Sequence, residues 1–329
     1  MIKVIFKRGS QLESEHEVKT VVLNSKNNVV FSTKNDNDIT FPRSAIKIFQ
    51  ALPMIQNGSY KFYNLNSKQI ALSASSHFGE PKHIFLLYKW LKKLRIDENI
   101  LKCGIHNPLN LKSSNDLLYS KIRPTQIYNN CSGKHLGMIT SSIYKGFNVK
   151  NYTNFNHPLQ KDILKILEYF NEYKIKDKFK AIDGCSAPQY SFPLKNLALS
   201  MQKISNFNLL EPLLSFSLKK IIDSISQNPF YIGGTGRLDS QIIKITKGRI
   251  FCKIGAEGIF MFSDFKKNYG GIIKIKDGNQ RALPIVVIKL LKKIKSINKN
   301  EYELLSILQK NIIYNHKNIK VGIIECKFL

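Results

Sequence analysis

A serine and a lysine three positions apart are the first residues in this sequence whose types and spacing suit catalysis. Ser44 and Lys47 lie just after Pro42, in a segment whose apolar residues recur at helical intervals. Positions three apart share one face of a helix, so the Lys47 amine can reach the Ser44 hydroxyl. A lysine kept neutral by burial and by a neighbouring cation such as Arg43 can accept the serine proton. The spacing alone is weak evidence, because Ser-x-x-Lys arises often by chance in a lysine-rich chain.

A second lysine motif, late in the chain, supports this interpretation. Lys253 begins a Lys-Ile-Gly run on a predicted strand, much as Lys-Thr-Gly follows Ser-x-x-Lys in penicillin-recognising enzymes. Between the two motifs, Ser75 and Ser76 offer a further hydroxyl near the site. Spacing alone instead favours a polar turn, formed with His77, before the helix that begins at His83.

Cysteine, lysine and histidine form a separate constellation in the middle of the chain. Cys131, Lys134 and His135 lie within five positions, just before and at the start of a predicted helix, and Asp183 and Cys185 follow further on. Thiolates are favoured zinc ligands, so these side chains could supply three positions of a zinc site, although the spacing matches no common zinc finger. A nucleophilic Cys131 with His135 as its base is one alternative. Another is that the cysteines are ordinary buried side chains.

Charge and hydropathy narrow the cellular role of the chain. The formal net charge is +28, but the lysines are spread through every segment with Asn and Ile, and no recognisable nucleic-acid module accompanies them. A solvated basic surface without a specific nucleic-acid partner is therefore expected. The apolar stretch at Met1 is too short for a signal peptide, and no apolar run approaches the ~20 residues of a membrane helix. With an odd number of scattered cysteines, these features predict a cytoplasmic protein with reduced thiols and no membrane partner.

The hydrophobic pattern places strands at both ends of the chain and helices in its middle. Two strands joined by a hairpin are predicted near the N-terminus, at 17–23 and 28–33, and a helix runs from 43 to 52 with Pro53 closing it. Further helices are predicted at 83–94, 135–144, 159–173, 193–204, 209–225, 281–297 and 301–308. Later strands are predicted at 241–246, 249–254, 259–262, 272–276 and 320–325. The pattern indicates an α+β fold in which N- and C-terminal strands form one mainly antiparallel sheet covered by helices. Residues 1–329 are expected to form a single domain, with a mainly helical subregion at roughly 80–230.

The motifs together resemble the rhizobial-type L-asparaginase family, also called type II or thermolabile. The resemblance runs from end to end in the family order and rests on these segments: Arg8-Gly9 with Glu13-Ser14 and His16, 42–47 with 50–53, 76–81, 130–135, 183–188, 253–258, and 277–279 with Arg281-Ala282. It implies a fold like that of serine β-lactamases, L-asparagine as the substrate, and a homodimer.

The resemblance also assigns roles to individual residues. It implies two catalytic Ser-Lys pairs, Ser44 with Lys47 and Ser76 with Lys253. It further implies that zinc is bound by Cys131, Lys134 and Cys185, that Asp183 holds the substrate's amino group, and that Arg43 and His135 lie close to catalytic or ligand residues. A lysine that binds zinc must be neutral, so metal binding should depend on pH.

The resulting hypothesis is an amidohydrolase in which Ser44, deprotonated by Lys47, attacks the side-chain amide of L-asparagine and releases ammonia. Ser76 and Lys253 would relay protons or position the amide, and the opposite assignment, with Ser76 as nucleophile, is chemically equivalent. Two other functions share part of this pattern. One is a penicillin-interacting serine hydrolase of the β-lactamase or D,D-peptidase kind, and the other is a non-enzymatic basic binding protein.

Overall fold

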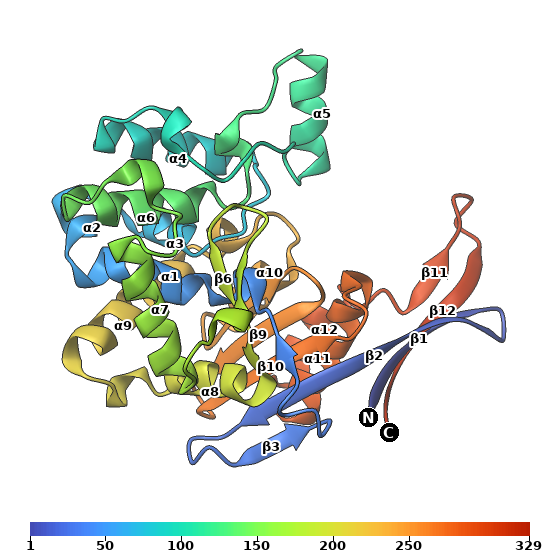
Figure 1. The fold of residues 1–329 in the computed structure, drawn as a ribbon. Helices are drawn as coiled ribbons and strands as arrows, with labels where there is room; N and C mark the ends of the chain where they lie inside the picture. Colours follow the sequence, from blue (N-terminus) through green and yellow to red (C-terminus); the bar gives the residue numbers. More distant parts are fainter. The chain divides into compact units, whose positions relative to one another are not determined.

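The computed structural model describes all residues, 1–329, and its chain divides into two compact units. One, here called the sheet unit, comprises residues 1–45, 192–206 and 241–329. The other, the helical unit, comprises residues 46–191 and 207–240. Figure 1 labels helices and strands of both units.

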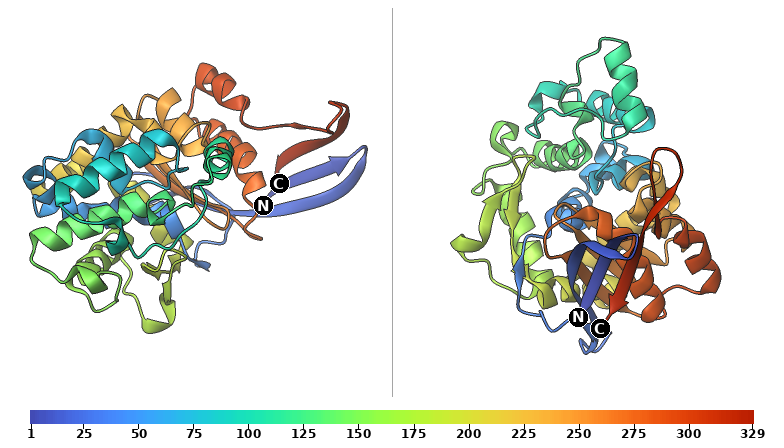
Figure 2. Two further views of the ribbon diagram at one scale, coloured as in Figure 1. Left: turned by 90° about the horizontal axis from the view of Figure 1, so that it is seen from above. Right: turned by 90° about the vertical axis from the view of Figure 1, so that its right-hand side faces the viewer.

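The sheet unit is built on an eight-stranded, antiparallel sheet. Its strands, in spatial order, are β11 (Ile312–Tyr314), β12 (Lys320–Phe328), β1 (Ile2–Arg8), β2 (Gln11–Leu23), β10 (Tyr269–Ile275), β9 (Ile259–Asp264) and β8 (Ile250–Gly255), while β3 (Val29–Ser32) pairs with β2. The first and last long strands are neighbours, with Ile2 opposite Phe328, so both chain ends lie side by side (Figure 2). A separate two-stranded ladder joins β4 (Ile39–Thr40) to β7 (Phe192–Pro193).

Helices cover this sheet where its strands are most apolar. Every residue of β8 and β9 is buried, which requires cover on both faces. Helix α8 (Leu194–Ser205) packs on β10, and α11 (Leu283–Lys293) packs on β9 and β12 and is followed by α12 (Lys299–Ser306) (Figure 1). A side chain at Gly270 on β10 would come within 1.9 Å of the Gln202 backbone, so a glycine is required for this close approach.

The helical unit is organised around α1 (Lys47–Gln56), whose residues from Lys47 to Ile55 are all buried. Helices α6 (Ser132–Tyr144), α7 (Pro158–Asn171) and α9 (Pro212–Gln227) pack against it. The remaining helices of this unit are α2 (Ser59–Phe62), α3 (Ser67–Ser73), α4 (Pro81–Leu94) and α5 (Leu111–Tyr119), and a short hairpin joins β5 (Lys180–Ile182) to β6 (Pro188–Tyr190). No helix in the chain is both long enough and apolar enough to cross a membrane.

The predicted fold class is confirmed: strands from both chain ends form one antiparallel sheet, and the middle of the chain is helical. The helical unit begins at Ile46, earlier than the expected start near residue 80. Strands β1 and β11 were not among the predicted elements. Whether the two units make up the single domain predicted for 1–329 stays a prediction.

Two local predictions were wrong. The isoleucine-rich run at 241–246 was expected to be a strand, but it belongs to helix α10 (Leu238–Ile245). Leu238, Ile242 and Ile243 are buried at helical spacing, and this burial outweighs the strand preference of isoleucine. Pro53 was expected to close the first helix, but α1 continues to Gln56 with Pro53 inside it. Because α1 is packed on nearly every side, tertiary contacts outweigh the backbone hydrogen bond that proline removes.

Candidate active site

Lys47, the first residue of α1, is a fully buried lysine whose partners are uncharged oxygens. Its Nζ donates to Ser76 Oγ at 3.0 Å and to the Ser75 carbonyl at 2.5 Å. All three residues belong to the helical unit. A lysine in contact with a hydroxyl and without a carboxylate partner is a candidate general base once it is neutral.

The backbone around Ser76 is held in place by a neighbouring segment. Ser76 follows α3, and its N–H donates to the Ile232 carbonyl at 2.9 Å, while the Phe78 N–H donates to the Gly233 carbonyl at 2.8 Å. The Ser76 side chain is 5% exposed, and the hydroxyl of Ser75 is buried without a hydrogen-bond partner. These bonds hold the backbone of the segment whose Ser76 hydroxyl contacts Lys47.

His77 ties the same segment to the start of α6. Its Nδ1 accepts from the Gly79 N–H at 3.2 Å, so Nε2 carries the proton and donates to Ser132 Oγ at 2.9 Å. Burial, followed by the neighbouring His83, lowers the pKa of His77 well below its usual value. His77 is therefore a neutral positioning group, and its bonding pattern leaves no free base at this ring.

Ser44 and Lys253 belong to the sheet unit. Ser44 is half-buried in a 3₁₀ turn, Arg43–Ile46, in which Arg43 takes a positive φ of 52°. Lys253 is 1% exposed on β8, and its Nζ donates to the Ile254 carbonyl at 3.2 Å. A side chain at Gly255 would come within 2.4 Å of the Pro42 carbonyl oxygen. Glycine thus lets the Lys-Ile-Gly strand lie directly against the chain that leads into Ser44.

The second constellation is a buried cluster at the N-terminus of α6. Cys131 precedes the first residue of α6, Lys134 lies within its first turn, and Cys185 lies in the loop of the β5–β6 hairpin. The exposed fractions of these side chains are 4%, 2% and 4%. Lys134 Nζ donates to Cys185 Sγ at 2.8 Å, and Asp183 Oδ2 lies 3.6 Å from the same sulfur. The hairpin loop therefore brings Asp183 and Cys185 to the start of α6.

Electrostatics polarise this cluster. The hydrogen bond from Cys131, together with the Lys134 charge, lowers the pKa of Cys185 far below its usual value. Burial acts to lower the pKa of Lys134, but the charges of Cys185, Cys131 and Asp183 outweigh it and raise the pKa. Both shifts favour the charged forms, a thiolate at Cys185 and an ammonium at Lys134.

His135 lies next to this pair and is fully buried. Its Nδ1 is 2.6 Å from the Tyr152 hydroxyl, and its Nε2 has no hydrogen-bond partner of good geometry. Burial lowers the pKa of His135, although the adjacent Cys185 acts to raise it. A buried, neutral imidazole with one unsatisfied nitrogen is suited to meeting a ligand or a polar group of a bound molecule.

The sequence matches the L-asparaginase II family over residues 4–326, nearly the whole chain. This chain belongs to the L-asparaginase II family. The match confirms the resemblance inferred from the motifs, and it covers every residue of both constellations. No curated protein sequence matches the chain.

Two solved structures resemble this member of the L-asparaginase II family weakly. A β-lactamase from Mycobacterium bovis aligns with a TM-score of 0.41 and 11% identity, covering 84% of this chain and 94% of its own. A protein assigned provisionally to the β-lactamases, from Bacteroides dorei, aligns with a TM-score of 0.39 and 11% identity, covering 88% and 93%. Similarity this low does not establish a shared fold.

In the structure of this L-asparaginase II family member, some of the predicted site residues lie together, and one further pair of residues is in contact. Cys131, Lys134, His135, Asp183 and Cys185 lie in one cluster, while the roles that the resemblance implies for them stay predictions. The sequence did not predict the hydrogen bond between Lys47 and Ser76, because these residues lie 29 positions apart and no spacing rule links them.

The family-implied pairs, Ser44 with Lys47 and Ser76 with Lys253, each join residues of the two units. Both pairs stay predictions. The Tyr152 and Ser132 hydroxyls, which fix the two histidines, had no signal in the sequence.

The donors at the α6 cluster fit a zinc ion in kind, provided that lysine takes part. No group of three His, Cys, Asp or Glu side chains is placed to hold a metal ion. Two buried sulfurs and one amine nitrogen are soft and borderline donors of the type that zinc accepts, and His135 Nε2 is an unsatisfied nitrogen beside them. A zinc site here therefore depends on Lys134 losing its proton.

Proposed function

We propose that this chain hydrolyses the side-chain amide of L-asparagine to L-aspartate and ammonia, with a serine nucleophile activated by Lys47. The observation that carries the proposal is the contact of 3.0 Å between the buried Lys47 Nζ and Ser76 Oγ. A buried lysine bonded to a serine is a Ser-Lys pair of the kind used for acyl transfer, and the chain belongs to the L-asparaginase II family.

Ser44 is proposed as the nucleophile. Its oxygen attacks the amide carbon of asparagine while a neutral Lys47 takes the hydroxyl proton. Lys47 is already bonded to Ser76, so the proton passes from Lys47 through the Ser76 hydroxyl to the amide nitrogen. The carbon–nitrogen bond then breaks, ammonia leaves, and an aspartyl ester remains on Ser44. A water molecule, deprotonated by the same lysine, hydrolyses the ester and restores the serine.

Ser76 is the alternative nucleophile, and the bond to Lys47 favours it directly. In that case Lys47 would remove the Ser76 proton without a relay, and Ser44 would assist the leaving group. The two assignments differ in which serine carries the aspartyl ester. Mass spectrometry of acid-quenched enzyme after mixing with asparagine distinguishes them, because the ester lies on the peptide of Ser44 or on that of Ser76.

The remaining predicted residues are proposed to bind and orient the substrate. Lys253 and Arg43 would supply positive charge for the α-carboxylate or for the developing oxyanion. Asp183 would hold the α-ammonium, and the neutral His135 would contact the ligand through Nε2. A shape-selective pocket separates asparagine from glutamine by only ~1–3 kcal/mol per methylene, so the ratio of the two activities measures how closely the pocket fits.

Zinc is proposed to be held by Cys131, Lys134 and Cys185. When bound, it would supply Lewis-acid polarisation and fix the loop that carries Asp183. Because Lys134 and Cys185 form an ammonium–thiolate pair, binding must release the lysine proton. Calorimetric zinc titrations in buffers of different ionisation enthalpy should therefore show proton release, from the Cys131 thiol as well as from Lys134, and Lys134→Met should weaken zinc binding. Equal heats in all buffers would argue against lysine ligation.

A homodimeric, cytoplasmic enzyme is proposed for the assembly and location. Sedimentation equilibrium of the purified chain tests the dimer. Localisation of a tagged chain in its host tests the compartment.

Ammonia release from L-asparagine by the purified chain, with and without added zinc, tests the proposed function. Ser44→Ala and Ser76→Ala should each lose at least ~10²-fold in kcat while keeping their thermal unfolding midpoints. No ammonia under any metal condition would contradict the proposal. Stable labelling of Ser44 by a fluorescent penicillin would instead support the penicillin-interacting hydrolase, and salt-dependent retention on DNA without amidase activity would support the basic binding protein.

A further inference from the structure

The sheet unit contains a polar network that the serine and cysteine chemistry does not use. His16 on β2 is 3% exposed, and its Nδ1 lies 2.6 Å from Asp277 Oδ2. Its Nε2 accepts from Arg281 Nε at 3.0 Å, and Arg281 Nη2 donates to Ser14 Oγ at 2.7 Å. An arginine N–H can only donate, so Nε2 is an acceptor and the Nδ1 proton of His16 points to Asp277. In this network of hydrogen bonds, Arg281 donates to both His16 and Ser14, and His16 donates to Asp277.

This network fixes the orientation of one arginine. The Arg281 guanidinium also lies 4.0 Å from the centre of the Phe6 ring, in a cation–π contact. Two of its five N–H groups are used by His16 and Ser14, which leaves three for a ligand. No carboxylate contacts Arg281, because Asp277 is bonded to His16 instead. Such an arginine is ordered before any ligand arrives, so binding costs little side-chain entropy.

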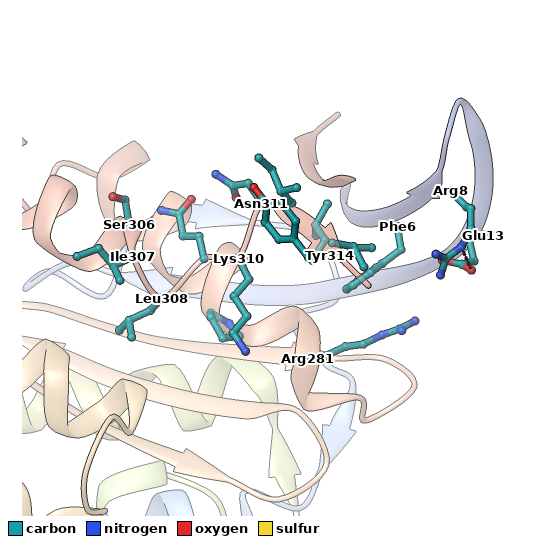
Figure 3. A pocket seen from close by; sticks show the side chains of 15 residues that line it. Phe6, Arg8, Glu13, Arg281, Ser306, Ile307, Leu308, Lys310, Asn311 and Tyr314 are labelled. Atoms are coloured by element: carbon teal, nitrogen blue, oxygen red, sulfur yellow. Dashed lines mark hydrogen bonds and ion pairs between the residues drawn. The ribbon is translucent and has the colours of Figure 1, made fainter. Parts of the chain in front are cut away.

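Arg281 lines a cavity of about 920 Å³ in the same unit (Figure 3). Apolar side chains form much of its wall: Phe6, Leu308, Ile312, Tyr314 and Ile324. The volume lies within the ~300–1,000 Å³ typical of small-molecule sites, which are mostly apolar with a few fixed polar groups. The cavity therefore has both the size and the lining of a ligand site.

The charges around the cavity are unbalanced towards positive. Arg8 and Glu13 lie at one end and neutralise each other, with Nε and Oε1 at 2.8 Å (Figure 3). Arg281 and Lys310 remain, and neither forms an ion pair. An occupant that complements this lining carries an anionic group for Arg281 and an apolar body for the opposite wall.

We propose that this cavity binds a small amphipathic carboxylate, held at its charged end by Arg281 and along its body by the apolar wall. The proposal is independent of the asparaginase chemistry, because none of its residues belongs to the Ser-Lys or cysteine constellations. A planar carboxylate matches the free edge of the guanidinium fork, whereas a neutral amide of the same shape would lose the charge-assisted bonds.

The test uses the full chain and the fluorescent aromatic anion 8-anilinonaphthalene-1-sulfonate as probe. The probe should bind the wild-type chain saturably, and 4-phenylbutyrate should displace it at concentrations at least tenfold lower than 4-phenylbutanamide. Arg281→Gln should weaken both anions at least tenfold and leave the amide unchanged. Arg95→Gln, which removes an exposed arginine of the helical unit and gives the same net charge, is the matched control and should bind as the wild type does.

Three results would overturn the proposal. One is equal displacement by the acid and the amide, which is measured on the wild-type chain and does not depend on how any variant folds. Another is equal binding by the Arg281→Gln and Arg95→Gln variants. The third is a wild-type chain that is dimeric and binds no probe, together with an Arg281→Gln variant that is monomeric. The cavity would then be a contact between two copies of the chain. Circular dichroism of each variant checks that it is folded.

Discussion

Each unit of the molecule contains a cation that is at least partly buried, and the two cations are bonded differently. In the sheet unit, Arg249 Nη2 bonds both carboxylate oxygens of Glu301 at 2.9 and 2.7 Å, and Nη1 bonds the Ser296 carbonyl at 2.7 Å. Asp264, which is fully buried, lies 3.5 Å from the same guanidinium. In the helical unit, Lys47 is fully buried and bonds only to a serine hydroxyl and a carbonyl.

On the proposed mechanism, this difference separates a structural charge from a reactive one. The carboxylates of Asp264 and Glu301 offset the cost of the partial burial of Arg249. No carboxylate bonds to Lys47, and its side-chain partner is a hydroxyl that can exchange a proton with it. The proposed role of Lys47 therefore depends on the identity of its partners and not on burial alone.

The sharpest way to break this comparison is to remove each cation in turn. Lys47→Met keeps the length of the side chain and removes the amine. It should lower kcat for asparagine by ~10²–10⁴-fold, the range that general acid–base catalysis contributes. Its unfolding midpoint should not fall, because the removed group has no charged partner. Ammonia release and thermal unfolding on the same preparation measure both effects.

Lys93→Met is the matched control for this variant. Lys93 also belongs to the helical unit and also donates to uncharged oxygens, including Gln69 Oε1 at 3.0 Å, but it is exposed. Its activity should stay within about twofold of the wild type. An equal loss in both variants would mean that general charge, and not the buried pair, supports the reaction.

Removing the structural cation should have the opposite pattern. Arg249→Met leaves Asp264 and Glu301 without their cation, and uncompensated buried carboxylates cost ~3–5 kcal/mol of unfolding free energy. The activity of the molecules that remain folded should be unchanged. Denaturant unfolding curves, with activity corrected for the folded fraction, measure this. A stable but inactive variant would place Arg249 among the catalytic groups.

The sequence predicted the fold class well because the signals were local. Hydrophobic spacing located most helices, and α4, expected at 83–94, spans Pro81–Leu94. It failed where burial contradicted residue preference, as at α10, and it did not identify β1, whose apolar residues alternate over only seven positions. Strand β11 has only three residues and is held by pairing with β12, a long-range contact that local patterning does not encode.

The candidate site was only partly predictable, for a similar reason. Motifs identified the individual residues, and Cys131 with Lys134 share one helical turn, so their proximity follows from sequence. Their contact with Cys185 depends on a hairpin loop 51 positions from Lys134, and the bond from Lys47 to Ser76 depends on the packing of the segment after α3. Resemblance supplied the first of these contacts, and only the structure supplied the second.

A pH titration extends the comparison to uncharged groups in the helical unit. Burial lowers the pKa of His83 to about 4, although the hydrogen bond between His83 and the Phe230 carbonyl acts to raise it. The unfolded chain therefore binds more protons than the folded chain between about pH 4 and 6.5, so stability is complete above 6.5 and is lost as pH falls towards 4. His83 should contribute ~2 kcal/mol to the loss between pH 7.5 and 5.

His83→Gln measures this contribution. Between pH 7.5 and 5, the wild type should lose ~2 kcal/mol more unfolding free energy than this variant does. The pKa of His77 is also lowered, so His77 still contributes to the pH dependence of both proteins. An identical pH dependence in both proteins would show that His83 is accessible to protons in the folded chain.

The smallest effect is expected at an exposed ion pair of the sheet unit. Lys3 Nζ lies 2.7 Å from Glu15 Oε1, and the side chains are 26% and 38% exposed. Solvent screens such a pair, so Lys3→Met should change the unfolding free energy by no more than ~1 kcal/mol. A loss as large as that of Arg249→Met would remove the distinction between buried and surface charge in this unit.

The most direct test of the account is a double-mutant cycle on Lys47 and Ser76, measured as kcat/KM for asparagine. If the two residues act as one proton-transferring pair, Lys47→Met and Ser76→Ala together should be no slower than the slower single variant. If the losses of the single variants multiply in the double variant, the two residues act independently, and the buried contact between them is structural.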